Sequence, residues 1–245
     1  MSLPVVDANA SNSPGRGPLG STEDGAWVDG FGVTAPDVTR YADVVRPLPD
    51  AITLAMRNVA EAEELCIVDP DTAALCGLLV RGLTGGRVVE AGTGIGYLTL
   101  LMARAVPQDC TITSVEFDPI RQAQAHAFLE REDPDCAVEL LLGDPGRVLE
   151  RELQAPIDAL VLTDPRLKRL DLIDQLTNRI APGGLLLVPH ALRGGRVADA
   201  SEAWGGDPDV EAQRLLNRCV ATDPRYTNAL LVPIGDGLLI ARRRG

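Results

Sequence analysis

The sequence is poor in aromatic residues and poor in basic ones. Phe, Trp and Tyr together make up 3% of the 245 residues, which leaves little surface for stacking bases or sugars. Lys and Arg number 23 against 35 Asp and Glu, so the formal net charge is -12 at pH 7. Because an acidic surface repels phosphate backbones and anionic lipids, we expect neither a nucleic acid nor a membrane as a partner.

Patterns typical of zinc-binding, secreted and membrane-spanning chains are also missing. The five cysteines form no C-x-x-C pair, so no zinc motif is predicted. No apolar run approaches the ~20 residues of a membrane-spanning helix. The first residues lack the basic and then apolar segments of a signal peptide. We therefore expect a cytoplasmic protein whose cysteines stay reduced.

The composition divides the chain into a leader and one domain. Residues 1–35 combine many Pro, Gly and Ser residues with no apolar periodicity, which predicts a disordered leader. Residues 36–84 have helical patterns and predict N-terminal cap helices. Residues 85–245 form the predicted Rossmann-like core, so the expected domain covers residues 36–245.

Strand and helix patterns alternate along the core, which predicts a parallel sheet with right-handed crossovers and helices on both faces. Two further apolar runs, at 230–233 and 238–241, flank a Gly-Asp-Gly turn and predict an antiparallel hairpin. The expected fold class is therefore α/β, with a mostly parallel sheet that ends in this hairpin. Strands are expected over residues 87–90, 111–116, 138–142, 157–162 and 185–188, and helices from Ala51, from Asp71 and over residues 97–106, 118–132, 168–180 and 210–221.

A glycine-rich segment follows the first predicted strand and precedes a helix. It reads Glu90-Ala91-Gly92-Thr93-Gly94-Ile95-Gly96, a G-x-G-x-G spacing that lets a ligand lie against bare backbone. A pyrophosphate loop would need its third glycine where Tyr97 stands. Glu90 suits a ligand with a cationic amine, and Glu116, about 20 residues beyond the loop, suits a ribose diol.

S-adenosylmethionine carries an ammonium, a carboxylate and a ribose, and this set of residues suits all three groups. On the alternative interpretation, the glycines only form a turn, and Glu90 and Glu116 are ordinary acids at strand ends. The spacing and the two acids together favour the cofactor site.

Several segments also resemble those of a known enzyme family, namely Val88–Tyr97, Val115–Asp118, Gly143–Asp144, Ala181–Gly184 and Val232–Leu238. Together they make the chain similar, from about Leu48 to Arg243, to class I S-adenosylmethionine-dependent methyltransferases. Within that class it resembles the small-molecule O-methyltransferases that include catechol and caffeoyl-CoA O-methyltransferases, particularly actinobacterial members. The resemblance implies a seven-stranded sheet whose last strand is antiparallel, and a homodimer.

The resemblance further implies how the cofactor is bound. The methionine part would lie on Glu90 and the glycine loop, the ribose on Glu116, and the adenine beside Phe117 and the residues after the third strand. One departure is Pro145, which stands where the family usually has alanine and has no N–H to donate to adenine. The implied cofactor-binding residues are Glu90, Gly92, Thr93, Gly94, Gly96, Tyr97, Glu116, Phe117, Gly143 and Asp144.

The family's metal ligands are only partly present. Its Mg²⁺-dependent members use one Asp after the fourth strand and an Asp-Asn pair after the fifth. Asp164 matches the first ligand, but Pro189-His190 replaces the pair, and the family's D-x-D-K segment reads Asp164-Pro165-Arg166-Leu167, with Lys168 one place late. Proline offers no side-chain ligand, and a lone imidazole suits softer metals. The sequence therefore argues against a Mg²⁺ site, and no metal ligand is predicted.

Asp164 and His190 are the predicted catalytic residues. His190 stands at the end of a central strand, where open α/β sheets place their sites. A neutral His190 would take the proton from an acceptor hydroxyl; on the other interpretation it only caps a backbone group. Arg166, Lys168 and Arg193 suit either an acidic acceptor or an ordinary charged surface.

These observations predict a small-molecule O-methyltransferase that uses S-adenosylmethionine without a metal ion. Two alternatives stay open at this point: a non-catalytic protein that kept the cofactor pocket, and a nicotinamide-dependent oxidoreductase. The glycine spacing and Glu90 disfavour the oxidoreductase. The net charge disfavours nucleic-acid methylation. The sequence carries no pattern that names the acceptor.

Overall fold

The computed structural model describes residues 40–41, 43–83, 86–153, 156–164, 169–199 and 206–245. The chain forms two compact units, residues 1–48 and 49–245. In the first unit the described residues 40–41 and 43–45 are helical, and the predicted leader lies outside the described residues. The second unit contains the whole sheet described below. None of the helices in the described part of the chain is long and apolar enough to cross a membrane.

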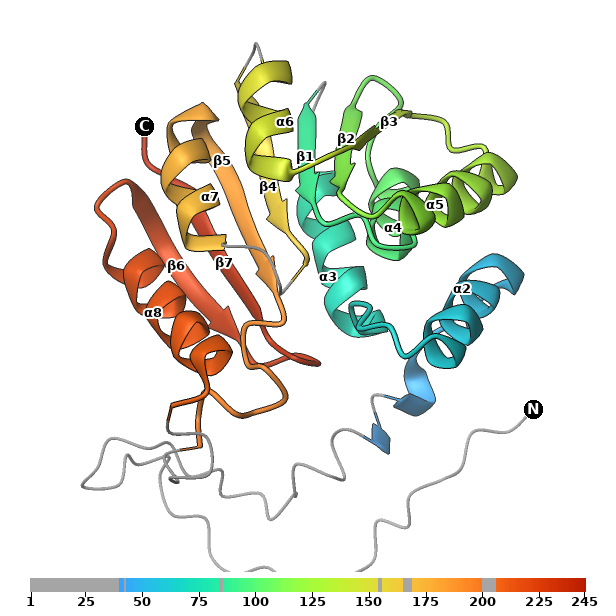
Figure 1. Cartoon of the computed structure of the whole chain (residues 1–245), viewed down its shortest axis with the longest axis horizontal. Helices are drawn as coiled ribbons and strands as arrows, with labels where there is room; N and C mark the ends of the chain where they lie inside the picture. Colours follow the sequence, from blue (N-terminus) through green and yellow to red (C-terminus); the bar gives the residue numbers. More distant parts are fainter. Residues whose placement is uncertain (1–39, 42, 84–85, 154–155, 165–168, 200–205) are drawn as a thin grey trace, which may run out of the picture. The chain divides into compact units, whose positions relative to one another are not determined.

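The described residues of the second unit form one seven-stranded sheet, in the order β3-β2-β1-β4-β5-β7-β6 (Figure 1). The first five strands are parallel, and β7 runs antiparallel to both β5 and β6. This arrangement confirms the predicted mixed sheet with its C-terminal hairpin. The strands are β1 (Arg87–Ala91), β2 (Thr111–Glu116), β3 (Ala137–Leu142), β4 (Ile157–Leu162), β5 (Ile180–Pro189), β6 (Tyr226–Val232) and β7 (Leu238–Arg243).

Four helices begin at the same dipeptide, an Asp followed by Pro. The carboxylates of Asp69, Asp118, Asp144 and Asp207 each accept backbone N–H groups of the first turn. The proline then takes a first-turn position, where its missing N–H costs no hydrogen bond. The helices are α2 (Ala51–Ala62), α3 (Pro70–Arg81), α4 (Tyr97–Ala105), α5 (Pro119–Glu132), α6 (Pro145–Glu152), α7 (Arg169–Leu176) and α8 (Pro208–Thr222).

Two elements differ from the sequence-based expectation. Helix α6 was not predicted, although its capping Asp and first-turn Pro are visible in the sequence. The predicted helix over 168–180 ends at Leu176, and a 3-10 turn at Thr177–Arg179 leads into β5. Strand β5 therefore begins at Ile180, and Pro182-Gly183-Gly184 forms an irregularity inside the strand, where its register against β4 shifts. Pro182, Gly183 and Gly184, which predicted the end of a helix, therefore mark a β-bulge instead.

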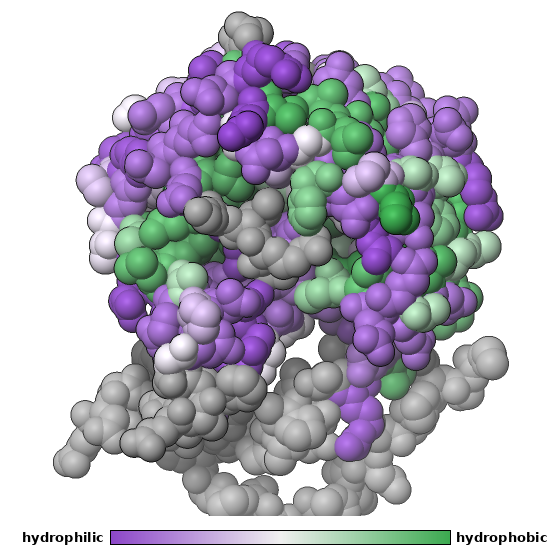
Figure 2. Space-filling model, viewed as in Figure 1, coloured by the Kyte–Doolittle hydropathy of each residue, from purple (hydrophilic) through white to green (hydrophobic). Residues whose placement is uncertain are grey.

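Alternate side chains of the strands enter two separate hydrophobic cores. Ala159 and Val161 of β4 pack on the face covered by helices α2 to α5, and Leu160 and Leu162 pack on the face covered by α6 to α8. All four side chains are completely buried. Each large aliphatic side chain buried in this way stabilises the fold by about 1.5–3 kcal/mol. Hydrophilic residues predominate on the face drawn in Figure 2, with apolar residues in separate patches between them.

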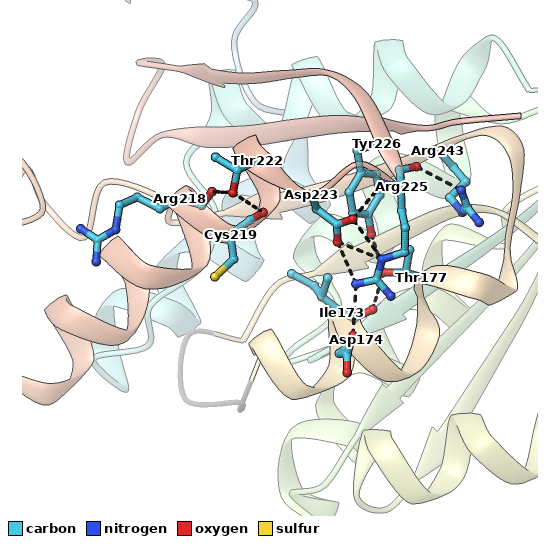
Figure 3. A network of polar contacts seen from close by, with 10 residues as sticks. All are labelled: Ile173, Asp174, Thr177, Arg218, Cys219, Thr222, Asp223, Arg225, Tyr226 and Arg243. Carbon is cyan, nitrogen blue, oxygen red and sulfur yellow. Dashed lines mark hydrogen bonds and ion pairs between the residues drawn. The ribbon is translucent and has the colours of Figure 1, made fainter.

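A polar network fastens the edge strand β6 to the helical layer (Figure 3). The hydroxyls of Thr177 and Tyr226 lie 2.7 Å apart in a buried hydrogen bond. The guanidinium of Arg225 pairs with Asp223 at 2.7 Å and with Asp174 of α7 at 3.1 Å. These contacts hold the C-terminal hairpin in place next to β5.

The turn between β6 and β7 is fixed by the start of α3. One carboxylate oxygen of Asp69 caps α3, and the other accepts the backbone N–H of Asp236 at 3.3 Å. The Thr72 hydroxyl donates to the carbonyl of Ile234 at 3.1 Å. Gly235 has a φ of +52°, and a Cβ on it would lie 1.8 Å from the Asp69 carboxylate. This close approach leaves room only for glycine.

Replacing Gly235 with alanine should therefore destabilise the fold far more than the same change at Gly195. Both glycines have positive φ, but a Cβ on Gly195 meets no atom within 4 Å. We expect Gly195→Ala to lower the free energy of unfolding by about 1–2 kcal/mol, and Gly235→Ala by about 3 kcal/mol or more because the helix cap is also lost. Urea unfolding of the two variants measures this, and equal losses would contradict the clash with Asp69.

Candidate functional site

The glycine loop leaves β1 at Ala91 and enters α4 at Tyr97. Gly92, Gly94 and Gly96 have φ values of +100°, +55° and +84°. A Cβ on Gly92 would lie 2.4 Å from the Cβ of Asp164, whereas a Cβ on Gly94 would meet no atom within 4 Å. Gly92 thus permits close packing against Asp164, and Gly94 faces open space where a ligand can approach the backbone.

A cavity of about 310 Å³ opens beside this loop, within the usual range for small-molecule sites. Its walls come from the connector between α2 and α3, from the glycine loop, and from the ends of β2 and β4. The connector belongs to the region expected to form the cap over the core. The lining residues are Glu64, Leu65, Cys66, Ile67, Val68, Gly92, Thr93, Gly94, Ile95, Tyr97, Leu98, Glu116, Asp118, Arg121, Thr163 and Asp164.

Glu116 is held rigidly in the cavity wall at the end of β2. Its Oε2 atom accepts the backbone N–H of Gly94 at 2.7 Å. Its Oε1 atom accepts the backbone N–H groups of Phe117 and Asp118, each at 3.0 Å. The side chain is 1% exposed in the ligand-free chain, so its carboxylate is oriented before any ligand arrives. The structure thus brings Glu116 to the loop, as the spacing suggested.

Glu90 lies behind the loop and is not among the residues that line the cavity. Its side chain is completely buried and accepts hydrogen bonds from the hydroxyls of Thr99, Ser114 and Thr163. Burial raises the pKa of Glu90 to about 7, and these three hydroxyls partly oppose that rise. The Ser114 hydroxyl also lies 2.6 Å from that of Thr93. Glu90 therefore reaches the cavity wall through a chain of hydroxyls rather than directly.

The other predicted cofactor residues fall into two groups. Thr93 and Tyr97 line the cavity. Gly96, Phe117, Gly143 and Asp144 are not among its lining residues, although the Gly143 N–H donates to the carbonyl of Glu116 at 2.8 Å and so lies beside it. Asp144 caps α6 by accepting the N–H of Arg147 at 3.0 Å. Phe117 is 45% exposed, which leaves its ring accessible to a ligand outside the cavity.

His190 follows β5 directly and is 4% exposed. Its Nδ1 atom lies 3.1 Å from a carboxylate oxygen of Asp236, in the β6–β7 turn. The Sγ atom of Cys66 lies 3.7 Å from Nδ1 and 3.9 Å from Nε2 of the same ring. Burial lowers the pKa of His190, but the bonds with Asp236 and Cys66 outweigh burial and raise the pKa to about 9. This raised pKa favours a protonated ring at neutral pH, whereas the sequence-based hypothesis has a neutral His190.

Asp164 follows β4, is 6% exposed and lines the cavity. A buried guanidinium, that of Arg169, lies near it and donates to the carbonyl of Pro189 at 3.0 Å. Burial, followed by the charge of Arg193, lowers the pKa of Arg169 to about 10, so this side chain stays positively charged at neutral pH.

The residues around Asp164 do not fit the family's Mg²⁺ site. Where that site has an Asp-Asn pair, this chain has Pro189, whose carbonyl is already bonded to a cation, and a protonated His190. Hard divalent ions need several free oxygen ligands. In the described ranges, no group of three or more His, Cys, Asp or Glu side chains is arranged to hold a metal.

Of the three basic residues expected to suit an acidic acceptor, only Arg193 can be located. Its side chain is 11% exposed and pairs with Asp209 at 3.1 Å, so it is not an ordinary surface charge. Residues 165–168, which include Arg166 and Lys168, lie outside the described residues.

Sequence reasoning missed Cys66, Arg169 and Asp236 as members of this site. A signal existed for Asp236. Because β7 is antiparallel to β5, with Leu238 opposite Pro189, the turn before β7 must lie beside the residue after β5. For Cys66, nothing in the sequence indicates which strand end the α2–α3 connector meets.

Comparison with known proteins places the chain in a family. The sequence profile of the O-methyltransferase family matches residues 50–244. A candidate O-methyltransferase of Mycobacteroides abscessus is 35% identical over 196 residues, which cover 79% of this chain and 89% of that protein.

Solved structures confirm the fold. An O-methyltransferase from Bacillus cereus in complex with S-adenosylhomocysteine has a TM-score of 0.71 at 23% identity, covering 84% of this chain and 97% of that one. The O-methyltransferase TomG of Streptomyces achromogenes, involved in tomaymycin synthesis and solved with S-adenosylmethionine, has a TM-score of 0.72 at 22% identity, covering 85% and 96%. The profile and the relatives together show that this chain belongs to the O-methyltransferase family, which confirms the enzyme class predicted from its sequence.

Proposed function

We propose that this chain transfers the methyl group of S-adenosylmethionine to a hydroxyl of a small molecule without a metal ion. The observation that carries the proposal is the oriented carboxylate of Glu116 beside the open glycine loop, in a cavity lined by strand ends. The bound cofactor supplies an activated methyl group, which leaves the sulfonium for the acceptor oxygen.

The donor is held by groups that the loop and β2 present to the cavity. Glu116 accepts a hydroxyl of the ribose, since its Oε2 atom is bonded to only one backbone N–H group and keeps a lone pair. Helix α4 begins after Gly96 with no side-chain cap, so the positive end of its dipole favours a carboxylate there. Thr93 is fixed through Ser114 and Glu90, which keeps this wall in one conformation.

The acceptor oxygen must approach the methyl group as an anion or lose its proton during transfer. Asp164, a buried carboxylate in the cavity wall, accepts that proton. Protonated His190, oriented by Asp236, then donates a hydrogen bond to the developing oxyanion. The positive charge of His190 thus stabilises the oxyanion, as a divalent ion does in metal-dependent members of the family.

Glu116→Gln should weaken the binding of S-adenosylmethionine and S-adenosylhomocysteine to a similar extent, because both carry the ribose. Loss of hydrogen bonds to a charged acceptor costs about 1.5–3 kcal/mol, or roughly 10- to 150-fold in Kd. Calorimetric titration measures the change. Glu139→Gln, on the exposed edge strand β3, is the control, and we expect it to bind normally. Equal affinity of the two variants would remove Glu116 from the site.

Methyl transfer should persist when metal ions are removed. Purified protein is assayed with labelled S-adenosylmethionine and a panel of phenols and hydroxy acids, first in EDTA and then with added Mg²⁺. We expect the same transfer rate in both buffers, because a protonated His190 and the buried Arg169 supply the positive charge. Transfer that appears only with Mg²⁺ contradicts the proposal. Cofactor binding without transfer to any acceptor would favour the non-catalytic alternative.

The rate should fall as the pH rises through about 9, because His190 then loses the proton that it donates. The stabilisation of the fold by the His190–Asp236 pair is complete below the ordinary His pKa of 6.5 and is lost as the pH rises from there through about 9. Asp236→Asn removes the carboxylate that raises the pKa of His190, so the fall should move to lower pH. The profile of kcat against pH measures this, with His126→Gln on the exposed face of α5 as control. An unmoved profile in Asp236→Asn would exclude His190 as the titrating group.

A further inference from the structure

Cys66, which lines the cavity, forms one array with His190 and Asp236, neither of which is among the lining residues. Cys66 belongs to the α2–α3 connector, His190 follows β5, and Asp236 lies in the β6–β7 turn. The Nδ1 atom of His190 is 3.1 Å from Asp236, and its two ring nitrogens are 3.7 and 3.9 Å from the Cys66 sulfur. Asp236 is itself fixed by the backbone N–H of Gly194. A sulfur, an imidazole and a carboxylate in this order are the parts of an activated thiol.

Cys66 differs in its surroundings from the other four cysteines. Cys76, Cys110 and Cys136 are buried, and Cys219 on α8 is partly buried, whereas Cys66 is exposed and lines the cavity. Burial raises the pKa of Cys76 to about 12, which keeps that thiol protonated. The hydrogen bond with His190 lowers the pKa of Cys66. Accessibility and a lowered thiol pKa therefore coincide at Cys66.

The charges that face Cys66 favour an ion pair. His190 lowers the pKa of the thiol by its hydrogen bond and its charge, and Arg193 lowers it further by its charge. Asp236 acts in the opposite direction on the thiol, but it also keeps His190 protonated. The direct partner of the Cys66 sulfur is thus the His190 imidazolium. The Asp236 carboxylate is bonded to His190.

We propose that Cys66 is a modification site, a thiolate paired with the His190 imidazolium that reacts with peroxides and soft alkylating agents at the wall of the donor cavity. With hydrogen peroxide, the thiolate attacks one oxygen, an S–O bond forms and the O–O bond breaks. The sulfur is oxidised by two electrons to a sulfenic acid, and the departing hydroxide takes the proton of His190 to give water. No further reactant is needed.

Modification at this position alters the cavity itself. Leu65, Cys66 and Ile67 are consecutive wall residues, so any atom added to the sulfur takes space from a cavity of about 310 Å³. It also removes the anion that pairs with His190. The consequence for donor binding rests on the proposed function, whereas the reactivity of Cys66 does not. Donor binding and thiol modification should therefore exclude each other.

The experiment compares the alkylation rates of individual cysteines in the folded full-length chain. Purified protein is treated with iodoacetamide at pH 7, and labelling of each cysteine is followed by mass spectrometry. We expect Cys66 to react about tenfold or more faster than Cys219, because its thiolate fraction at pH 7 is larger. Its rate should reach half its maximum below the ~8.5 of an ordinary thiol. His190→Gln should remove most of this advantage. Equal rates at Cys66 and Cys219, or a half-maximum at an ordinary pH, would overturn the proposal.

The link to the cavity is tested with the same samples. S-adenosylhomocysteine at saturation should slow the labelling of Cys66 about tenfold or more and leave that of Cys219 unchanged. Pretreatment with hydrogen peroxide should weaken S-adenosylhomocysteine binding in the wild type and in Cys219→Ser, but not in Cys66→Ser, each compared with its own untreated sample. Fast labelling without protection by the ligand would overturn the link between Cys66 and the donor cavity. If the untreated protein binds no ligand at all, the donor assignment fails, and the labelling rates still decide the thiolate.

Discussion

The packing of Gly92 against Asp164 is the contact on which the candidate site depends. A Cβ on residue 92 would lie 2.4 Å from the Cβ of Asp164 and 2.5 Å from its backbone nitrogen. Since β1 and β4 are neighbours in the sheet, this approach sets the loop that leaves β1 against the segment that leaves β4. Both segments line the cavity. One backbone contact therefore positions the proposed donor loop and the proposed proton acceptor relative to each other.

Cationic and anionic side chains lie close together around the end of β5. Arg169 and His190 are buried cations, and Arg193 is nearly so, while Asp164, Asp209 and Asp236 are the carboxylates that interact with them. Removing such charges from water is costly unless partners are close. An added divalent cation would meet the positive charges of Arg169 and His190, and the carbonyl of Pro189 is already bonded. Pro189 and His190 thus present a bonded carbonyl and a cation where the resembled family has an Asp-Asn pair.

The local half of the site is predictable from the sequence, and the remainder is not. The glycine spacing, the acid at the end of β2 and the Asp-Pro helix starts are all encoded by adjacent residues. Glu90 shows the limit of such reasoning: the sequence places an acid beside the loop but does not reveal that three hydroxyls close around it. Cys66 and Asp236 lie 124 and 46 residues from His190 along the chain. Their meeting requires the strand order, and also the α2–α3 connector, whose path no local pattern determines.

The single imidazolium ring of His190 faces both the Asp236 carboxylate and the proposed Cys66 thiolate. This sharing links the thiol to the proposed methyl transfer. In the free chain the imidazolium is shared between the Asp236 carboxylate and the Cys66 sulfur. An acceptor oxyanion that takes a hydrogen bond from the same ring competes with the sulfur, because Nδ1 is committed to Asp236. The thiol then loses its cationic partner and its pKa rises toward that of an ordinary cysteine. An occupied acceptor site should therefore quench the thiolate even where it does not cover Cys66. We therefore expect the reactive thiolate of Cys66 only in the enzyme without a bound acceptor.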